Sequence, residues 1–200
     1  MELRAPAILI ASRPHGETAA IARLLTENHG LVAGYVAGGR GRQLRPVMIP
    51  GNSVEVEFRA KSDTQLPFAR IELTESRAPW MTEPLPAAAI QWACALTVSA
   101  LPERAPYPTI YSGLDALLTA ICHAPSARGW LSVMVTYEAM VLRELGYGGA
   151  KPDASGDFSE QFETFRQLHR PIRDYLLAER AGDVMSARTA LGERLARMNT

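Results

Sequence analysis

The sequence predicts an α+β protein in which a small β-barrel, residues 1–78, is followed by an α-helical domain, residues 79–200. Short apolar segments joined by glycine-rich turns fill the first part. Three prolines stand within the eight residues from Pro79 to Pro86, which indicates a boundary between domains. Beyond them, apolar residues recur every three or four positions, a spacing typical of helices.

Four segments of the first part have the pattern of β-strands: residues 5–12, 31–39, 52–60 and 66–76. Arg13-Pro14 is expected to close the first of them. In the last two strands we expect the following side chains to point into the barrel: Val54, Val56, Phe58, Phe68, Ile71 and Leu73.

The segment 17–30 fits two structures. Its residues suit a helix by propensity, with Ile21, Leu24 and Leu25 on one face and Gly30 as the C-cap. It also suits a strand, because residues 26–30 resemble a hairpin turn. The residues themselves leave both interpretations open.

The second part predicts a bundle of helices. Residues 109–122 and 128–149 each carry an apolar stripe, and the glycines from Gly146 onward stop the second helix. Asp157 and Glu160 form a capping pair for a later helix that carries three phenylalanines. The last helix has this buried stripe: Val184, Leu191, Leu195 and Met198.

Composition excludes several functional classes. Lys plus Arg equals Asp plus Glu, at 21 each, so net charge gives no global sign of a polyanionic partner. The cysteines Cys94 and Cys122 lie far apart without a CxxC, and the four histidines fall in different elements, so neither a metal site nor a catalytic motif is expected. The apolar run before Arg13 is too short for a signal peptide or a membrane span. We expect a cytoplasmic protein with no cofactor, no membrane contact and no enzymatic activity.

One local charge pattern stands out. Between Asn28 and Val54 there is no carboxylate, while Arg40, Arg42 and Arg45 lie among glycines. One interpretation is an exposed hairpin that arginines keep soluble. The other is a phosphate-binding loop on the barrel, in which glycines let the backbone approach a polyanion. Candidates to extend this nucleic-acid site are Arg13, Arg59 and Lys61; Tyr35 and Phe58 are candidates for base stacking, with the barrel core as the alternative place for both.

Several motifs, in the same order, resemble the RecO family of bacterial recombination mediators. They are the stretch from Ala7 to Thr18 with its Ile-Leu, Arg-Pro and Glu-Thr pairs, LLTENHG at 24–30, GYVAGGR at 34–40, IYSGL at 110–114 and YEAMVLRELGY at 137–147. The resemblance implies an oligonucleotide-binding (OB) fold followed by a helical domain, and it makes 17–30 a strand.

The resemblance also implies a function. Members of this family bind single- and double-stranded DNA, anneal complementary strands, and cooperate with RecR to load RecA onto DNA coated by single-strand-binding protein. They also dock the C-terminal tail of that protein on the helical domain. As geometric guesses for this tail pocket we name Leu118, Arg128, Tyr137 and Arg143.

The chain departs from the family in one respect. Many members carry four zinc-binding cysteines after the Leu-Gly-Tyr motif, where this chain has GGAKPDASGDFSE, so zinc is not carried over. Two other functions stay open: an RNA-binding OB-fold module, and a scaffold that binds only proteins. The final helix carries Arg188, Arg194 and Arg197, which we interpret as a solvated face, with an extension of the DNA path as the alternative.

Overall fold

The computed structural model describes residues 2–62, 65–149, 152–153, 155–178 and 181–198. The chain divides into two compact units. The barrel unit contains the chain up to Thr82 together with Leu101–Pro108, and the helical unit contains Glu83–Ala100 and the chain from Thr109 onward. Part of the loop expected in place of the zinc cysteines, residues 150, 151 and 154, lies outside the described residues.

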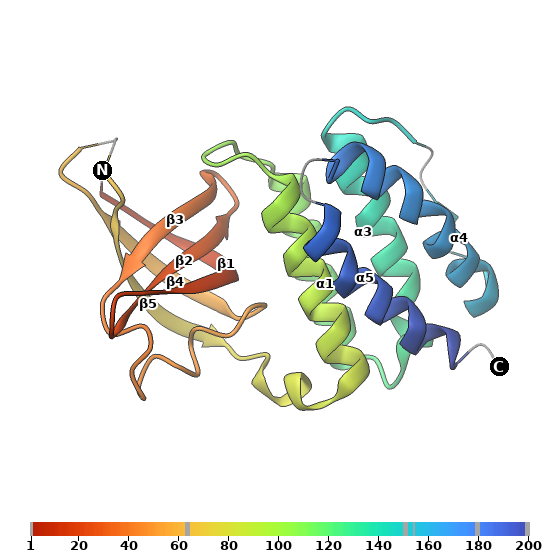
Figure 1. The fold of residues 1–200 in the computed structure, drawn as a ribbon, viewed down its shortest axis with the longest axis horizontal. Helices are drawn as coiled ribbons and strands as arrows, with labels where there is room; N and C mark the ends of the chain where they lie inside the picture. The colour runs from red at the N-terminus through yellow and green to blue at the C-terminus, as the bar shows by residue number, and fades with distance from the viewer. Residues whose placement is uncertain (1, 63–64, 150–151, 154, 179–180, 199–200) are drawn as a thin grey trace. The chain divides into compact units, whose positions relative to one another are not determined.

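The barrel unit is a closed five-stranded barrel (Figure 1). Its strands follow the order β1-β2-β3-β5-β4, which is the topology of an OB-fold and confirms the predicted α+β class. β3 and β5 run parallel and the other neighbours run antiparallel. The strands are β1 Glu2–His15, β2 Ala19–Thr26, β3 Gly30–Val36, β4 Ser53–Arg59 and β5 Phe68–Glu75.

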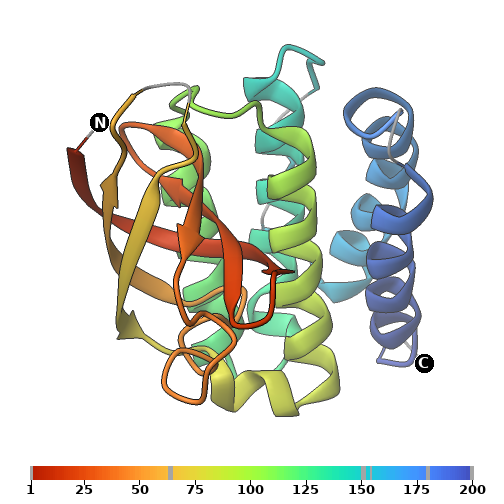
Figure 2. The same cartoon turned by 60° about the vertical axis from the view of Figure 1, so that its left-hand side comes forward.

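The first strand is longer than the sequence predicts. Arg13 and Pro14 do not close it, because β1 continues to His15 and Pro14 still pairs with Ala20 of β2. β1 pairs with two neighbours along different parts of its length: its first half pairs with β4 and its second half with β2. The pairing with β2 has an irregularity between Leu9 and Ala11. A bulge of this kind bends a strand, which lets one strand close the barrel (Figure 2).

The ambiguous segment forms a strand and a hairpin. Thr26 Oγ1 donates to the Gly30 carbonyl at 3.0 Å and accepts from the His29 backbone at 3.2 Å, so the side chain fastens the turn. Gly30 has a φ of +66°, and a Cβ there would lie 2.0 Å from the Ala105 carbonyl oxygen. Gly30 therefore permits a close backbone approach within the barrel unit rather than capping a helix.

Alternation along β4 is confirmed and along β5 is partly wrong. Val54, Val56 and Phe58 are buried in the barrel core, as predicted. In β5 the core side chains are Ala69 and Ile71, while Phe68 is 59% and Leu73 is 39% exposed. Strict alternation from Ile71 places Phe68 on the outer face, because successive side chains of a strand point to opposite sides.

The helical unit is built from five α-helices and several short turns, counted over the part of the chain that the structure describes. α1 packs against α5, and α3 packs against α4. The bounds are α1 Pro84–Ala100, α2 Pro108–His123, α3 Leu131–Glu144, α4 Phe158–Pro171 and α5 Ala181–Ala196, with a π-helical turn at Ile172–Leu176. None of the described helices is long and apolar enough to cross a membrane.

Two predicted helix boundaries are confirmed by their caps. Asp157 accepts from the Glu160 backbone at 3.0 Å, and Glu160 accepts from the Asp157 backbone at 2.8 Å, so the capping box is complete. After α3, Gly146, Gly148 and Gly149 all have positive φ values, a conformation that stops a helix.

One predicted surface residue is buried. Arg188 of α5 is 2% exposed, so it is neither part of a solvated face nor open to DNA. Its guanidinium pairs with Glu138 of α3, and the same carboxylate accepts a hydrogen bond from Trp92 of α1 at 2.7 Å. The arginine therefore joins three helices within the unit.

Candidate nucleic-acid interface

The arginine-rich loop, residues 37–51, is folded against the barrel rather than extended into solvent. Met48 is buried in the barrel core, and Leu44 and Val47 pack against the same core. Backbone hydrogen bonds of 2.9 and 3.0 Å turn the loop on itself, from Arg45 to Gly41 and from Met48 to Leu44. The loop, orange in Figure 2, thus has an apolar side fixed to the barrel.

A buried asparagine holds the end of this loop. Asn52 is 0% exposed, and its Nδ2 donates to the carbonyls of Pro46 and Val47 at 2.9 and 3.0 Å. Its Oδ1 accepts from the Arg77 backbone at 2.7 Å. The Nδ2 group thus makes two hydrogen bonds and the Oδ1 atom makes one, so this side chain fixes the loop relative to the strands.

The three loop arginines differ in their surroundings. Arg40 Nη1 donates to the carbonyls of Gly16 and Glu17, both at 3.1 Å, so its guanidinium fastens the loop to the β1–β2 turn. Arg42 and Arg45 are exposed and form no ion pair with another described residue. Arg42 and Arg45 are therefore the loop cations best placed to meet a phosphate, and Arg40 has a structural task as well.

The three further cations named from the sequence are exposed on the same barrel. Arg13 lies near the end of β1, Arg59 ends β4, and Lys61 follows it. Arg59 pairs with Glu57 and, at 3.6 Å, with Glu2. Pairs as exposed as these contribute little to stability, so a phosphate can compete for Arg59.

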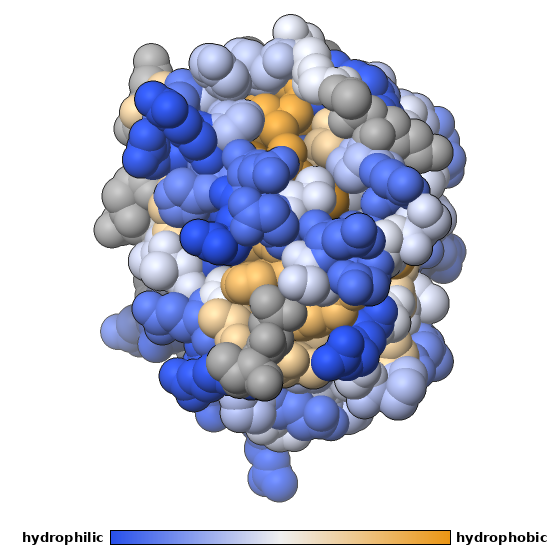
Figure 3. Space-filling view, turned by 90° about the vertical axis from the view of Figure 1, so that its right-hand side faces the viewer, coloured by the Kyte–Doolittle hydropathy of each residue, from blue (hydrophilic) through white to orange (hydrophobic). Residues whose placement is uncertain are grey.

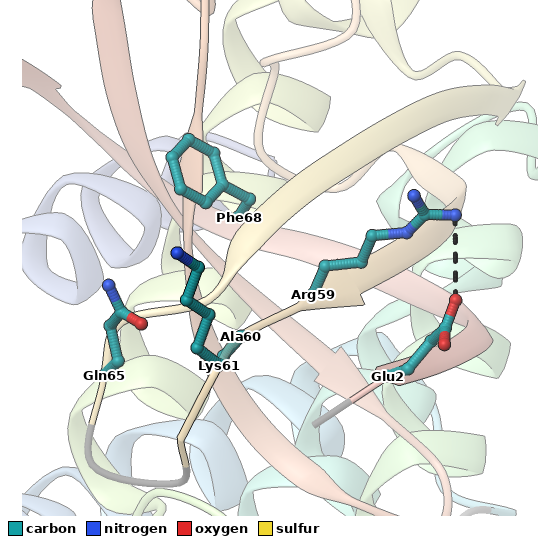
Figure 4. Close-up of a pocket in the computed structure, with 6 residues that line it drawn as sticks. All are labelled: Glu2, Arg59, Ala60, Lys61, Gln65 and Phe68. Carbon is teal, nitrogen blue, oxygen red and sulfur yellow. Dashed lines mark ion pairs between the residues drawn. The ribbon is translucent and has the colours of Figure 1, made fainter.

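Arg59 and Lys61 border a hollow on the outside of the barrel (Figure 4). Its volume is about 740 Å³. In Figure 4 the side chains of Lys61 and Gln65 lie on the side of the Phe68 ring, whereas Arg59 turns toward Glu2. The residues that line it are Glu2, Arg59, Ala60, Lys61, Gln65 and Phe68.

Of the two stacking candidates, one belongs to the core and one to the surface. Phe58 is 0% exposed and fills the barrel. Tyr35 is half-buried on the outer face, where its ring meets those of Phe68 and His15 edge-on. The sequence pattern predicts Phe68 in the core and does not indicate His15 at all; the alternation of Ala69 and Ile71 is the signal that identifies Phe68 as a surface residue.

Strand register brings these groups into one row. Arg13 of β1 lies opposite Ile21 of β2, which lies opposite Tyr35 of β3. Tyr35 is in turn paired with Phe68 of β5, and Phe68 with Arg59 of β4. Side chains directly opposite each other on one face lie close enough to touch, so Arg59 adjoins the aromatic pair directly, whereas the buried Ile21 separates Arg13 from Tyr35.

In the helical unit, the four guessed tail-pocket residues do not form one open surface. Leu118 and Tyr137 are 0% and 1% exposed. The Tyr137 hydroxyl is hydrogen-bonded to Thr97 at 2.5 Å, and burial raises the pKa of Tyr137. Arg128 and Arg143 are exposed, and the Arg128 guanidinium lies 5.0 Å from the centre of the Phe158 ring.

An open apolar groove does exist between α4 and α5. It has a volume of about 480 Å³, and its floor includes Phe162 and Phe165. Arg166 and His169 stand on the wall contributed by α4. In Figure 3, apolar surface on this face of the helical unit lies between hydrophilic ridges. The structure therefore offers a place for an apolar peptide that the sequence did not indicate.

Comparison with known proteins identifies the family. The family model "Recombination protein O N terminal" matches residues 1–77, and "Recombination protein O C terminal" matches residues 82–153. A DNA repair protein RecO of Phenylobacterium zucineum is 36% identical over 217 aligned residues, covering 98% of this chain and 88% of the relative. One of Caulobacter vibrioides is 39% identical, covering 88% of this chain and 76% of the relative.

Coverage of other relatives is smaller. A DNA repair protein RecO of Rhodospirillum centenum is 42% identical over 149 residues, which are 74% of this chain and 58% of the relative. This chain therefore spans little more than half the length of some curated relatives. Both halves of the family pattern nevertheless match in order, on a barrel and a helical unit of the expected kinds. The chain belongs to the RecO family of DNA repair proteins.

Proposed function

We propose that this protein is a non-enzymatic mediator of recombinational repair that binds single- and double-stranded DNA and anneals complementary strands. With RecR, it would help load RecA onto DNA coated by single-strand-binding protein. Membership of the family supports the proposal. The observation that carries it is the placement of Arg42 and Arg45 on the exposed side of a loop whose apolar side is fixed in the barrel core.

Strand annealing would depend on electrostatic contacts to phosphates. Two DNA strands repel each other through their phosphates, and a protein that neutralises phosphates on both lowers that repulsion. Base pairing then decides which strands stay together. The proposed contacts are to phosphates, which carry no base code, so we expect no sequence preference. The proposed contact residues are Arg13, Arg40, Arg42, Arg45, Arg59 and Lys61.

The test is fluorescence anisotropy of a labelled oligonucleotide at several salt concentrations. The double variant Arg42→Ala/Arg45→Ala removes two contacts and keeps the Arg40 anchor. On single strands its slope of log affinity against log salt should be shallower than that of the unaltered protein by about 1.4, from roughly 0.7 per contact. The same variant should also anneal complementary oligonucleotides more slowly.

A matched control removes the same charge elsewhere. Arg170→Ala/Arg173→Ala changes two exposed arginines of the helical unit and should leave the slope unchanged. Equal slopes for all three proteins would remove the loop from the DNA site. A competition with RNA of the same sequence separates this proposal from an RNA-binding module, since strong RNA preference would favour the module.

We further propose that the groove between α4 and α5 holds the apolar end of the tail of single-strand-binding protein. The groove combines an aromatic floor with the cation Arg166 on its α4 wall, while Glu193 stands on the α5 wall. Burial lowers the pKa of His169, so near pH 7 its ring is neutral and can only form a hydrogen bond. The groove therefore suits the apolar end of the tail, with Arg166 as the partner for a carboxylate. Arg128 and Arg143 remain the alternative cations for the tail.

Calorimetric titration with a synthetic tail peptide distinguishes these two positions. Phe162→Ala should weaken binding several-fold if the tail lies in the groove, and Arg143→Ala should not. The opposite pattern, loss with Arg128→Ala or Arg143→Ala alone, would place the tail near the end of α3.

A further inference from the structure

We propose that Phe68, braced by Tyr35, is a stacking platform for an unpaired base, and that through it the barrel distinguishes single strands from duplex. This inference rests on the proposed DNA binding and adds to it the part of the nucleic acid that is recognised. It starts from an unusual exposure: Phe68 is 59% exposed, more than any other large apolar side chain in the described part of the chain.

The barrel's own packing gives no reason for an aromatic residue at this position. Ala69 and Ile71 supply the core contacts of β5, and Phe58 already fills the interior beside them. A lone exposed apolar residue needs no explanation. Phe68 is not alone, because Tyr35 contacts its ring and Leu66, in the preceding loop, is 39% exposed.

Three rings from three strands form a connected chain on the outer face. The centres of the Phe68 and Tyr35 rings are 5.2 Å apart with their planes at 75°, and those of Tyr35 and His15 are 5.8 Å apart at 89°. Edge-to-face contacts of this kind are attractive and hold both partners in place. The Phe68 ring is therefore positioned by its neighbours while most of its surface stays accessible.

Cations stand on two sides of this ring. The larger hollow, of about 740 Å³, places Lys61 and Gln65 beside Phe68 (Figure 4), and its volume lies within the range of small-molecule sites. A second hollow of about 150 Å³ lies between Phe68, Arg59, Arg70 and Glu57. A base against Phe68 would thus have Lys61 near one flanking phosphate. Arg59 or Arg70 would be near the other, and would exchange an exposed ion pair for it: Arg59 pairs with Glu57, and Arg70 pairs with Glu72 at 3.3 Å.

This combination points to an unpaired base rather than to an apolar peptide. Alternating aromatic and cationic side chains on a barrel surface are typical of proteins that bind single strands, where each stacked base contributes about 1–3 kcal/mol. A duplex keeps the faces of its bases inside the stack. It can therefore reach the same cations but not the ring.

The first experiment compares Phe68→Leu with the unaltered protein, by anisotropy at low salt, on a single strand and on a duplex of equal length. Stacking worth about 1–3 kcal/mol predicts single-strand affinity about 5- to 150-fold weaker in the variant. Duplex affinity should stay within about twofold. The matched control is Leu73→Ala, an exposed apolar residue of the same strand, which should change neither.

A second substrate isolates the base. A single strand with abasic residues keeps its phosphates and loses the groups that stack. The unaltered protein should bind it about as weakly as Phe68→Leu binds the normal strand, and Phe68→Leu should not discriminate between the two. Thermal unfolding of the variants checks that Phe68→Leu is folded, as expected for a side chain outside the core.

The outcomes separate this inference from the proposed function. If the unaltered protein binds neither strand nor duplex, DNA binding itself fails. If it binds both, and Phe68→Leu loses nothing or loses duplex and abasic strand equally, the stacking platform is overturned while DNA binding stands. In that second case a protein partner is the remaining ligand for the exposed ring.

Discussion

Arg188 and Glu138 form a bidentate ion pair in the interior of the helical unit. Arg188 Nε lies 2.9 Å from Glu138 Oε1, and Nη2 lies 2.8 Å from Oε2. The guanidinium also stands 3.9 Å from the centre of the Phe165 ring. Removing two charges from water is costly, and these contacts offset that cost only while both partners are present.

The first prediction follows from this pairing. Arg188→Ala should lower the free energy of unfolding by about 3–5 kcal/mol, because it leaves the Glu138 carboxylate buried without its partner. Urea denaturation measures this loss. Arg143→Ala, which removes an exposed arginine, should change stability by less than about 0.5 kcal/mol.

A double variant tests the cause. Arg188→Met/Glu138→Gln removes both charges and keeps an acceptor for the Trp92 indole, which donates to Glu138 at 2.7 Å. It should be more stable than Arg188→Met alone, which fills the same volume and leaves the Glu138 carboxylate unpaired. Equal stability of these two variants would mean that packing, and not an uncompensated charge, explains the loss in Arg188→Ala.

The second prediction compares two glycines with the same backbone conformation. Gly30 and Gly38 both have a φ of +66°, but a Cβ at Gly30 would lie 2.0 Å from the Ala105 carbonyl oxygen, and a Cβ at Gly38 would have no neighbour within 4 Å. Gly38→Ala should therefore cost only about 1–2 kcal/mol, for the left-handed conformation. Gly30→Ala should cost about 1–3 kcal/mol more, for the steric overlap. Similar costs in chemical denaturation would show that the approach to Ala105 does not constrain the fold.

The third prediction concerns the loop anchor. Asn52→Ala removes both hydrogen bonds to the loop carbonyls of Pro46 and Val47, so the loop should open more often while the strands remain paired. Limited trypsin digestion should then cleave after Arg40 and Arg42 faster than in the unaltered protein. Mass spectrometry identifies the cuts, and cleavage after Arg166 in α4 serves as the internal reference. An unchanged ratio of loop to helix cleavage would show that Asn52 does not hold the loop.

The fourth prediction uses a buried thiol. Cys94 of α1 is 2% exposed, and burial raises its pKa to about 12. The thiolate is the reactive form, so at pH 8 Cys94 should resist iodoacetamide in the native protein and react once urea unfolds it. Cys122→Ala leaves Cys94 as the single reporter. Rapid labelling of this variant without denaturant, at unchanged circular dichroism, would mean that α1 opens locally.

Local pattern was sufficient for part of the fold. The alternation of Val54, Val56 and Phe58 predicts β4 correctly, because a half-buried strand has a period of two. The spacing of Asp157 and Glu160 predicts the start of α4, since a capping box is a local interaction. Both features depend on residues that are neighbours in the chain.

Features that depend on distant parts of the chain were harder to predict. α1 has no distinct apolar stripe, because apolar residues such as Ile90, Trp92 and Leu96 are buried around much of its circumference. Arg188 looks like a surface residue until α3 brings Glu138 to it, 50 residues away in sequence. For the candidate site, the sequence predicts the candidate cations from their local clustering, but only strand register pairs Phe68 with Arg59 and with Tyr35.

The return of Leu101–Pro108 to the barrel unit affects how the protein can be divided. A gene fragment that ends at Thr82 would omit Glu103, which pairs with Arg23 at 2.9 Å, and Arg104, whose backbone donates to Leu31 at 2.9 Å. A fragment that ends at Pro108 would restore both contacts but would carry α1 without α3 and α5. Neither unit is therefore one continuous segment of the chain. An exchange of domains between relatives by a single crossover would leave either the barrel unit or the helical unit incomplete.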